Sequence, residues 1–268
     1  MIIENDSLSL QQIADSGQLF RMTAEGEGYR LVAFGRELFL SQSGNKISLD
    51  CTEEDFENIW RNYFDLDTDY SRIRAMIGKS GDGYLKAAAE AGRGIRILRQ
   101  EPFETLISFI ISQQMQIPRI REKVELLSEK YGEPLSETAH AFPTADRLAA
   151  VGEETLKDLG FGYRARYIDL GAKAVASGSF DLEKIYDMSY EEGLQRLEGL
   201  CGVGKKVANC VLLFAYHKVS AFPVDTWIKK IIDENYGGSF DTTAYRGFEG
   251  IVQQYMFYYE RLRTAKIR

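Results

Sequence analysis

Apolar and polar residues alternate in short runs through residues 18–50 of the chain. Two such runs, YRLVAF at 29–34 and ELFLSQ at 37–42, are separated by a glycine-containing turn. Alternation at a period of two residues places one face of a strand in a core and the other in solvent. The pattern predicts a small antiparallel sheet, followed by a helix over 52–63 that Thr52 caps.

Helical spacing of the apolar residues replaces this alternation from residue 101 onward. Repeats at i, i+3 and i+4 predict helices over residues 102–111, 117–130, 145–151, 155–159, 164–177, 181–188, 190–197, 205–216, 226–235 and 242–262. We therefore expect an α+β fold with a boundary near residues 92–97. An N-terminal domain over 1–97 would hold the sheet plus helices, and a helical domain would cover 98–268.

One turn in the helical half combines glycines with lysines. Leu200-Cys201-Gly202-Val203-Gly204 ends one amphipathic helix and precedes another, and its two glycines permit a tight turn with positive φ. The N–H groups and the dipole at the second helix's start can hold a phosphate. Lys205 and Lys206 lie in that first turn, where a cation gains no stability from the dipole. The positive potential favours a neutral amine, which is a nucleophile.

An aspartate follows these lysines along the chain. Pro223-Val224-Asp225 precedes the helix expected over 226–235, and Asp225 is nineteen residues after Lys206 (225 minus 206). Aspartate is a favoured N-cap, so an ordinary helical hairpin with a capping aspartate is the structural alternative.

The hairpin, the lysine and the aspartate together resemble the helix-hairpin-helix (HhH-GPD) DNA glycosylases. The match is carried by LEGLCGVGKKVANC at 197–210 and FPVDT at 222–226. A GVG hairpin alone also occurs in DNA-binding proteins without catalysis, whereas the lysine and aspartate at this spacing are specific. Three further segments are similar to segments of 8-oxoguanine DNA glycosylase/lyases: SGQLFR at 16–21, LRQEPFETLISFI at 98–110 and LGFGYRARY at 159–167.

This resemblance implies a mostly helical HhH-GPD glycosylase domain and a bifunctional glycosylase/lyase. Such an enzyme flips 8-oxoguanine out of duplex DNA, excises it, preferably opposite cytosine, and nicks the strand. Lys206 would attack C1′ and form a Schiff base that undergoes β-elimination. Asp225 would stabilise the developing oxocarbenium charge.

The resemblance also assigns residues to the base. The carbonyl of Gly17 would accept a hydrogen bond from N7–H of 8-oxoguanine and repel the bare N7 of guanine. Gln253 would bind the pairing edge. Phe257, which is on the same helix face as Gln253 at i+4, would stack on one side of the base and Cys210 on the other.

Contacts to the rest of the duplex are implied in the same way. Tyr163 is the wedge, while Gln114, Arg119 and Arg164 reach the opposite cytosine, whose O2 and N3 suit arginine forks. The residues implied at the DNA backbone are Gly202, Gly204, Lys205 and Trp227. A monovalent or hard cation could sit on the carbonyls of Leu200 and Val203 and bridge to phosphate.

Two departures from the family pattern affect the expected specificity. Gln113-Gln114-Met115-Gln116 stands where many eukaryotic members have a run of asparagines, and Trp227 replaces a histidine that contacts phosphate. Indole offers a single donor. These differences are typical of a bacterial or archaeal branch.

The cysteine content narrows the cofactor requirement. The chain has three cysteines, Cys51, Cys201 and Cys210. Endonuclease III-like enzymes typically carry a four-cysteine iron–sulfur cluster after the hairpin, which these three cannot form. We expect no required cofactor.

Composition bears on partners and compartment. The net charge of −7 and pI of about 5.1 are unusual for a protein that binds DNA. Basic residues nevertheless flank the matched motifs, at Arg93, Arg96, Arg99, Arg119, Arg121, Arg164, Arg166, Lys205, Lys206, Lys229 and Lys230. The sequence has neither a membrane-spanning apolar run nor a secretory signal pattern. We expect a monomer associated with the nucleoid in prokaryotic cytoplasm, with double-stranded DNA as partner and no membrane.

Two alternative functions stay open. One is an HhH glycosylase for another oxidised or mismatched base, which substrate panels would separate. The other is a non-catalytic module that binds a DNA structure. A pure binder needs no neutral amine, so Lys206 beside Gly204, with Asp225, argues against it.

Overall fold

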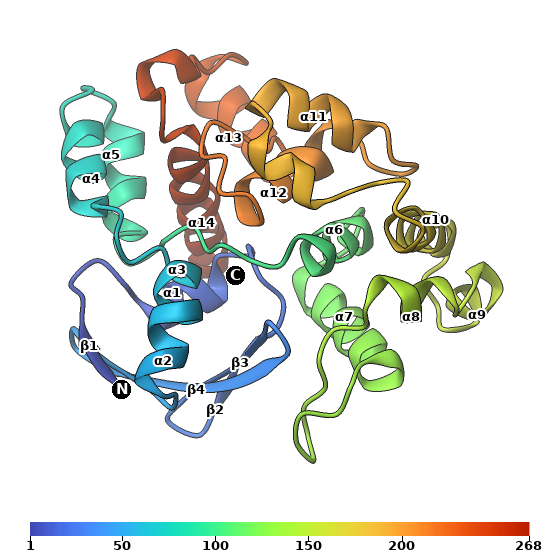
Figure 1. Cartoon of the computed structure of the whole chain (residues 1–268). Helices are drawn as coiled ribbons and strands as arrows, with labels where there is room; N and C mark the ends of the chain where they lie inside the picture. Colours follow the sequence, from blue (N-terminus) through green and yellow to red (C-terminus); the bar gives the residue numbers. More distant parts are fainter. Residues whose placement is uncertain (268) are drawn as a thin grey trace.

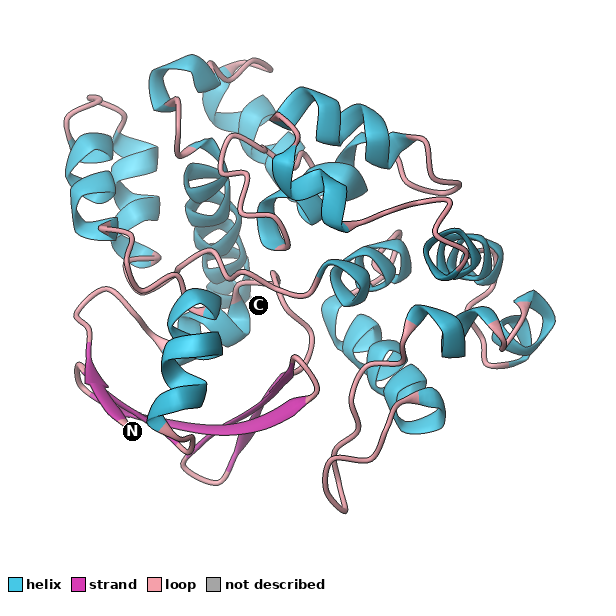
Figure 2. Ribbon diagram, in the orientation of Figure 1, coloured by secondary structure: helices cyan, strands magenta, loops and turns pink. Residues whose placement is uncertain are grey.

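Five antiparallel strands form a twisted sheet at one end of the molecule, in the order β1-β5-β4-β3-β2 (Figure 2). The computed structural model describes residues 1–267. The strands are β1 (Ile2–Glu4), β2 (Met22–Glu25), β3 (Gly28–Ala33), β4 (Arg36–Ser43) and β5 (Lys46–Leu49). Along β4, buried Leu38 and Leu40 alternate with exposed Phe39. The predicted sheet is confirmed, and β1 is an additional strand.

Short helices in the same part of the chain pack on this sheet. They are α1 (Leu10–Asp15), α2 (Glu53–Asp55), the π-helix η1 (Phe56–Trp60) and α3 (Arg61–Tyr63). The Thr52 cap is confirmed, since its hydroxyl accepts from the Asp55 N–H at 3.0 Å. The predicted 52–63 helix therefore exists, with a π turn in its middle. Trp60 shares a core with Leu31 and Leu38 of the sheet.

Helices make up the remainder of the described chain (Figure 1). They are α4 (Tyr70–Gly78), α5 (Gly83–Ala91), α6 (Pro102–Ile111), α7 (Ile117–Tyr131), α8 (Ala145–Ala149), α9 (Glu153–Asp158), α10 (Arg164–Ala176), η2 (Glu183–Asp187), α11 (Tyr190–Glu198), α12 (Lys205–Phe214), α13 (Thr226–Tyr236), η3 (Thr242–Tyr245) and α14 (Glu249–Ile267). The helical half is thus confirmed, and α4 and α5 were not predicted.

The predicted helix over 242–262 is wrong at its start. Residues Thr242–Tyr245 form a 3-10 turn, and Arg246 and Gly247 interrupt the helical conformation before α14 begins. Gly247 has φ +91, which no helix accommodates. Its N–H donates to the Glu249 carboxylate at 2.8 Å, which fixes the break. The 181–188 segment is likewise a 3-10 helix rather than an α-helix.

Residues 95–101 connect α5 to α6, and two arginines there are structural. Arg96 is 1% exposed and donates to the carbonyls of Phe64 at 3.0 Å and Thr68 at 2.7 Å. Arg99 pairs with Asp65 at 2.9 Å. Both belong to the basic residues that flank the matched motifs. Their guanidinium groups bind acceptors of the protein itself.

Packing divides the buried residues into two clusters. The sheet and its short helices form one, whereas Ile77 of α4 and Leu85 of α5 join the larger cluster of the C-terminal helices. Helices α5 and α14 pack directly on one another. The domain boundary at residue 97 stays a prediction, and α14 is the element that bridges its two sides.

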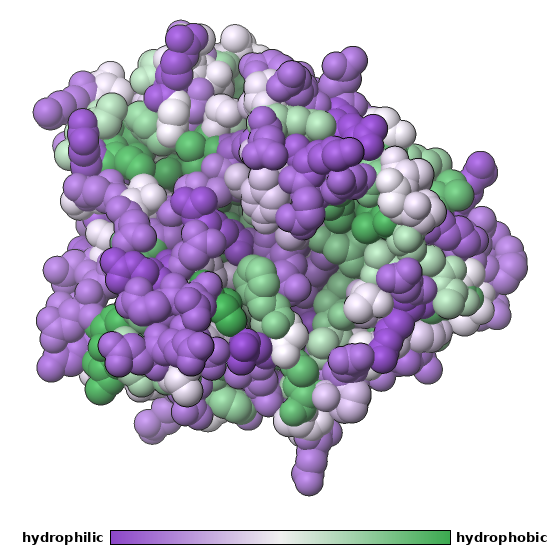
Figure 3. Space-filling model, in the orientation of Figure 1, coloured by the Kyte–Doolittle hydropathy of each residue, from purple (hydrophilic) through white to green (hydrophobic). Residues whose placement is uncertain are grey.

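The outer surface is largely polar. On the face in Figure 3, hydrophilic residues cover most of the area, and paler, apolar residues gather over α6 and α10. Within residues 1–267, no helix is both long and apolar enough to cross a membrane.

Candidate active site

A cavity of about 1140 Å³ opens where the chain's distant segments meet. Its walls come from α6, α7, α12, α13, α14 and the loop that follows α1. Of the residues singled out in the sequence, it is lined by Gly17, Gln114, Lys206, Cys210, Asp225, Trp227, Gln253 and Phe257. The structure thus brings the proposed nucleophile, the aspartate and the base-reading residues to one place.

The hairpin before α12 has one glycine that no residue with a side chain could replace without a clash. Gly202 has φ +81, and a Cβ there would be 2.2 Å from the Tyr167 ring. Gly204, expected to share the positive φ, is instead an extended N-cap with φ −92. A Cβ on Gly204 would meet nothing within 4 Å. The start of α12 is therefore open to a ligand, while Gly202 fits the hairpin against α10.

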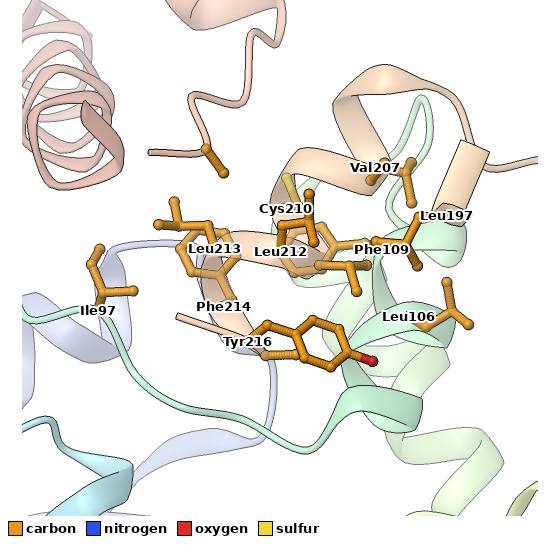
Figure 4. Packing of buried hydrophobic residues seen from close by; sticks show 14 of the residues in the cluster. Ile97, Leu106, Phe109, Leu197, Val207, Cys210, Leu212, Leu213, Phe214 and Tyr216 are labelled. Carbon is orange, nitrogen blue, oxygen red and sulfur yellow. The ribbon is translucent and has the colours of Figure 1, made fainter. Parts of the chain in front are cut away.

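Lys206 is the second residue of α12 and is half-buried at the cavity wall. Its ammonium lies 5.1 Å from the centre of the Phe109 ring on α6. The remainder of α12 is buried, and Figure 4 shows Cys210 and Phe214 beside Phe109. Lys205, by contrast, is exposed and does not line the cavity. Packing of α12 on α6 therefore holds Lys206 in place and separates it from its neighbour.

Cys210 is one turn after Lys206 and is 3% exposed. Burial raises the pKa of its thiol, although the charge of Lys206 acts in the opposite direction. The thiol therefore stays protonated at neutral pH and presents an uncharged, polarisable surface to the cavity.

Asp225 caps α13 and also faces the cavity. One carboxylate oxygen accepts the Ile228 N–H at 2.8 Å, so the capping prediction is confirmed. Burial raises the pKa of Asp225, while that N–H and the charge of Lys206 favour the anion. The carboxylate of Asp225 thus both caps α13 and faces the cavity. Positive charge that develops on a ligand nearby would stabilise this anion, which burial has deprived of water.

Gly17 lies in a loop whose backbone is tightly held. It has φ +75, and a Cβ there would be 3.1 Å from both Phe257 and Ile117. The next residue, Gln18, is fully buried; its side chain accepts from the Leu98 N–H at 2.9 Å and donates to the Arg96 carbonyl at 2.9 Å. Glycine is therefore required by both the backbone angle and the contact with Phe257.

Gln253 and Phe257 are 3% and 9% exposed and both line the cavity. The oxygen of Gln253 accepts from the amide of Gln254 at 3.0 Å. Within the described residues, the oxygen of Gln254 is buried and has no hydrogen-bond partner. A buried acceptor without a partner costs stability, so this amide pair is suited to a ligand that donates.

The residues expected to touch the opposite strand lie beside the cavity. Tyr163 is 46% exposed at the start of α10. Arg119 is exposed and pairs with Glu122 at 2.8 Å. Arg164 is only 9% exposed and donates to the Gln113 carbonyl at 2.9 Å. Its guanidinium therefore holds the 113–116 loop as the structure stands.

That loop links the hairpin to the predicted wedge. The amide of Gln113 donates to the Gly202 carbonyl at 3.0 Å, while Arg164 holds the Gln113 carbonyl. Gln114 is exposed with φ +51, a left-handed conformation that is strained for glutamine. A strained conformation persists only where the surrounding structure holds it, so the contacts of the 113–116 loop must fix the backbone of Gln114.

Several lining residues were missed in the sequence. Phe109 belongs to the apolar run LISFII, which reads as helix core, and its side chain under Lys206 could not be distinguished from its neighbours. Gln254 and Arg261 follow Gln253 on α14, and only the helical period would have indicated Arg261. Nothing in the sequence indicated that Ile117 would line the cavity.

The cation site on the Leu200 and Val203 carbonyls stays a prediction. The Leu200 carbonyl already accepts the Val203 N–H at 3.0 Å, which keeps the turn closed. In the described part of the chain, no three His, Cys, Asp or Glu side chains are grouped to hold a metal.

Two family models match residues 1–246 of the chain. Residues 1–106 match the 8-oxoguanine DNA glycosylase N-terminal domain, and residues 107–246 match the HhH-GPD superfamily of base excision DNA repair proteins. The chain belongs to the HhH-GPD superfamily. The hairpin, Lys206 and Asp225 all fall within the matched region.

Relatives agree with this family assignment. A probable N-glycosylase/DNA lyase of Methanothermobacter thermautotrophicus is 30% identical over 78% of this chain and 74% of its own length. The N-glycosylase/DNA lyase of Saccharomyces cerevisiae is 35% identical over 70% of this chain, which spans 54% of the yeast protein. Among solved structures, the 8-oxoguanine glycosylase/lyase of Clostridium acetobutylicum, in complex with double-stranded DNA that contains cytosine opposite 8-oxoguanine, superposes with a TM-score of 0.91 at 34% identity over 98% of both chains.

Proposed function

We propose that this HhH-GPD protein is a bifunctional 8-oxoguanine DNA glycosylase/lyase that acts on duplex DNA, preferably where cytosine opposes the lesion. The observation that carries the proposal is the single cavity in which Lys206 and Asp225 meet Gly17, Gln253 and Phe257. The named activities of the glycosylase/lyase relatives support the same reaction.

The first chemical step replaces the base with the lysine. The Lys206 ammonium gives up a proton, and the resulting amine bonds to C1′ while the C1′–N9 bond breaks; the electron pair of that bond leaves with the base, which takes up the proton. The sugar carries positive charge in the transition state. Asp225, ionised in a partly desolvated wall, stabilises that charge more strongly than it would in water.

The second step cleaves the strand. The sugar ring opens to a Schiff base on Lys206, a proton leaves C2′, and the C3′–O bond breaks with its electrons on the phosphate. Hydrolysis then releases the lysine. All of these steps need the Lys206 side chain alone as covalent partner, so no cofactor has to be supplied.

Base recognition is shared by three segments. The Gly17 carbonyl reads N7–H, Gln253 binds the pairing edge, and Phe257 and Cys210 enclose the two faces of the ring. The uncharged thiol and the aromatic ring suit a stacked base. Guanine, which lacks the N7 proton, would place a lone pair against the carbonyl of Gly17.

The opposite strand is read beside the cavity, whose wall includes Gln114. Tyr163, the exposed aromatic of this group, fills the gap left by the flipped base. Arg119, Gln114 and Arg164 then bind the orphaned cytosine. Arg164 would have to give up its bonds to the Gln113 carbonyl, so binding of DNA and rearrangement of the 113–116 loop are coupled.

The DNA backbone lies along the hairpin and α13. The open start of α12 at Gly202, Gly204 and Lys205 binds one phosphate, and Trp227 is beside it on α13. A monovalent or hard cation on the carbonyls of Leu200 and Val203 would bridge to this phosphate. We further propose that the enzyme works as a monomer on nucleoid DNA in prokaryotic cytoplasm.

Borohydride trapping tests the reaction and its nucleophile together. With a duplex that contains 8-oxoguanine opposite cytosine, borohydride should reduce the Schiff base to a stable protein–DNA adduct. Lys206→Gln should abolish both the adduct and base release, while Lys205→Gln keeps the adduct and weakens binding. An adduct that survives in Lys206→Gln would refute the assignment of Lys206. Release of other bases in preference to 8-oxoguanine would refute the proposed substrate.

A further inference from the structure

The loop that carries Gly17 is held from outside by two arginines of the helical half. Arg121 of α7 donates to the Ala14 carbonyl at 2.6 Å, and Arg261 of α14 donates to the Asp15 carbonyl at 2.6 Å. Ala14 and Asp15 are the last residues of α1, immediately before Ser16 and Gly17.

These contacts are matched to the electrostatics of α1. The last carbonyls of a helix carry partial negative charge and lack partners within the helix. The last turn of α1 has no basic residue of its own. Both of its cationic partners therefore come from elements that are more than one hundred residues away in the sequence.

Arg261 contacts a second part of the base site. Its guanidinium lies 5.6 Å from the centre of the Phe257 ring. The Gly17 backbone in turn approaches Phe257 so closely that a Cβ would be 3.1 Å from the ring. One arginine thus fixes both the loop of the reading carbonyl and the ring expected to stack on the base.

We propose that Arg121 and Arg261 are positioning residues for lesion recognition: they set the position of the Gly17 carbonyl relative to Phe257, and so control the discrimination of 8-oxoguanine from guanine. This inference rests on the proposed function. The contact that reads N7–H is a single hydrogen bond, whose strength falls steeply with distance and angle. A loop that shifts by about 1 Å would lose much of it.

The two arginines differ in a way that isolates positioning from direct contact. Arg261 lines the cavity, so its removal also changes the cavity wall. Arg121 is not among the lining residues and reaches the site through Ala14. Arg121→Met is therefore the decisive variant, and Arg261→Met the supporting one.

The test compares two substrates in single-turnover experiments. Arg121→Met and Arg261→Met should slow release of 8-oxoguanine by about 10- to 100-fold and leave cleavage at a preformed abasic site nearly unchanged. Lysine keeps the charge and a donor, so Arg121→Lys should recover part of the loss. Arg74→Met is the matched control, because Arg74 also donates to a distant carbonyl, that of Arg93 at 3.0 Å, outside the cavity.

A second readout does not depend on the reaction. Amide hydrogen exchange in residues 14–20 should be faster in Arg121→Met than in the wild type or Arg74→Met, with the melting temperature used to exclude unfolding. Unchanged hydrogen exchange, or equal losses of activity on lesion and abasic substrates, would overturn the inference. Excision of 8-oxoguanine by the wild type would still uphold the proposed function in that case. A wild type that cleaves abasic sites but ignores 8-oxoguanine would overturn the proposed function itself.

Discussion

The cavity and the junction around Asp65, where the 95–101 segment and His217 meet that carboxylate, are both buried polar regions. They are built in opposite ways. At the junction Asp65 is 2% exposed at its side chain and is surrounded by donors: Arg99 at 2.9 Å, Tyr70 at 2.9 Å and Thr68 at 3.0 Å. His217 lies 3.0 Å away. In the cavity wall, among the residues described, the oxygen of Gln254 has no partner at all.

The carboxylates of the two regions titrate in opposite directions. Burial would raise the pKa of Asp65, but His217 and Arg99 together lower it to about 2. Burial raises the pKa of Asp225, and the Ile228 N–H and Lys206 do not compensate fully. The carboxylate of the junction is thus committed to the fold, whereas the cavity keeps a desolvated anion and one amide oxygen that can accept from a ligand.

Removing the charge of Asp225 should give the largest effect. Asp225→Asn keeps a good N-cap, so the melting temperature should change little. Single-turnover release of 8-oxoguanine should fall by at least about 10²-fold, because the anion that faces the oxocarbenium ion is lost. Normal turnover combined with a large loss of stability would show that Asp225 only caps α13.

The same substitution at the junction should give the reverse pattern. Asp65→Asn leaves Arg99 and Tyr70 with a weaker acceptor and should destabilise the protein by about 3 kcal/mol. Activity per folded molecule should be unchanged. In the wild type, the stability from Asp65 is complete above its unfolded pKa and is lost as the pH falls through about 2. Urea unfolding at several pH values would measure the destabilisation by Asp65→Asn and the pH dependence of the wild type. A loss of activity without destabilisation would contradict the contrast between Asp65 and Asp225.

Within the cavity, base contacts and chemistry should separate. Gln253→Ala and Phe257→Ala should slow release of 8-oxoguanine by about 10-fold or more while abasic cleavage stays nearly intact, since that substrate has no base to hold. Arg119→Ala should instead flatten the preference for opposite cytosine. Excision rates against all four opposite bases, with abasic cleavage alongside, measure these effects. Equal losses on both substrates would assign Gln253 to the fold.

A smaller, pH-dependent effect is expected beside the sheet. Glu104 lies 3.9 Å from Arg21, and burial raises its pKa to about 8. A raised folded-state pKa stabilises the protein below the unfolded value and loses that stability as the pH rises through about 8. The wild type should therefore lose melting temperature relative to Glu104→Gln between about pH 5 and pH 9. Parallel curves for the two proteins would show that Glu104 is ionised throughout.

Patterns of local origin were predictable from the sequence. The period of two in residues 29–42 and the helical spacing after residue 101 gave β3, β4 and most helices, and the Thr52 and Asp225 caps follow from side-chain chemistry. Breaks that depend on one backbone angle were missed. Gly247, with φ +91, ends the helix expected over 242–262, and nothing in its neighbours indicated that.

Tertiary partners were the least predictable part of the site. The family resemblance named Gly17 and Phe257, yet their mutual contact appears only when α14 packs beside the loop after α1. The sequence indicates only that Arg96 and Arg99 flank the matched motifs, and it cannot show the carbonyls and the carboxylate that bind them. The roles of the site residues stay predictions until the variants are measured.

The contact between Gly202 and Tyr167 sets a dimension of the DNA complex. The glycine abuts the Tyr167 ring, and that ring lies 5.8 Å from the ring of Tyr163 on the same helix. In the proposed complex, the turn expected to bind a phosphate and the aromatic expected to enter the duplex are therefore held at a fixed spacing. A straight double helix that does not match this spacing has to bend, so most of the cost of opening the damaged pair would fall on the DNA, while the protein rearranges at the 113–116 loop.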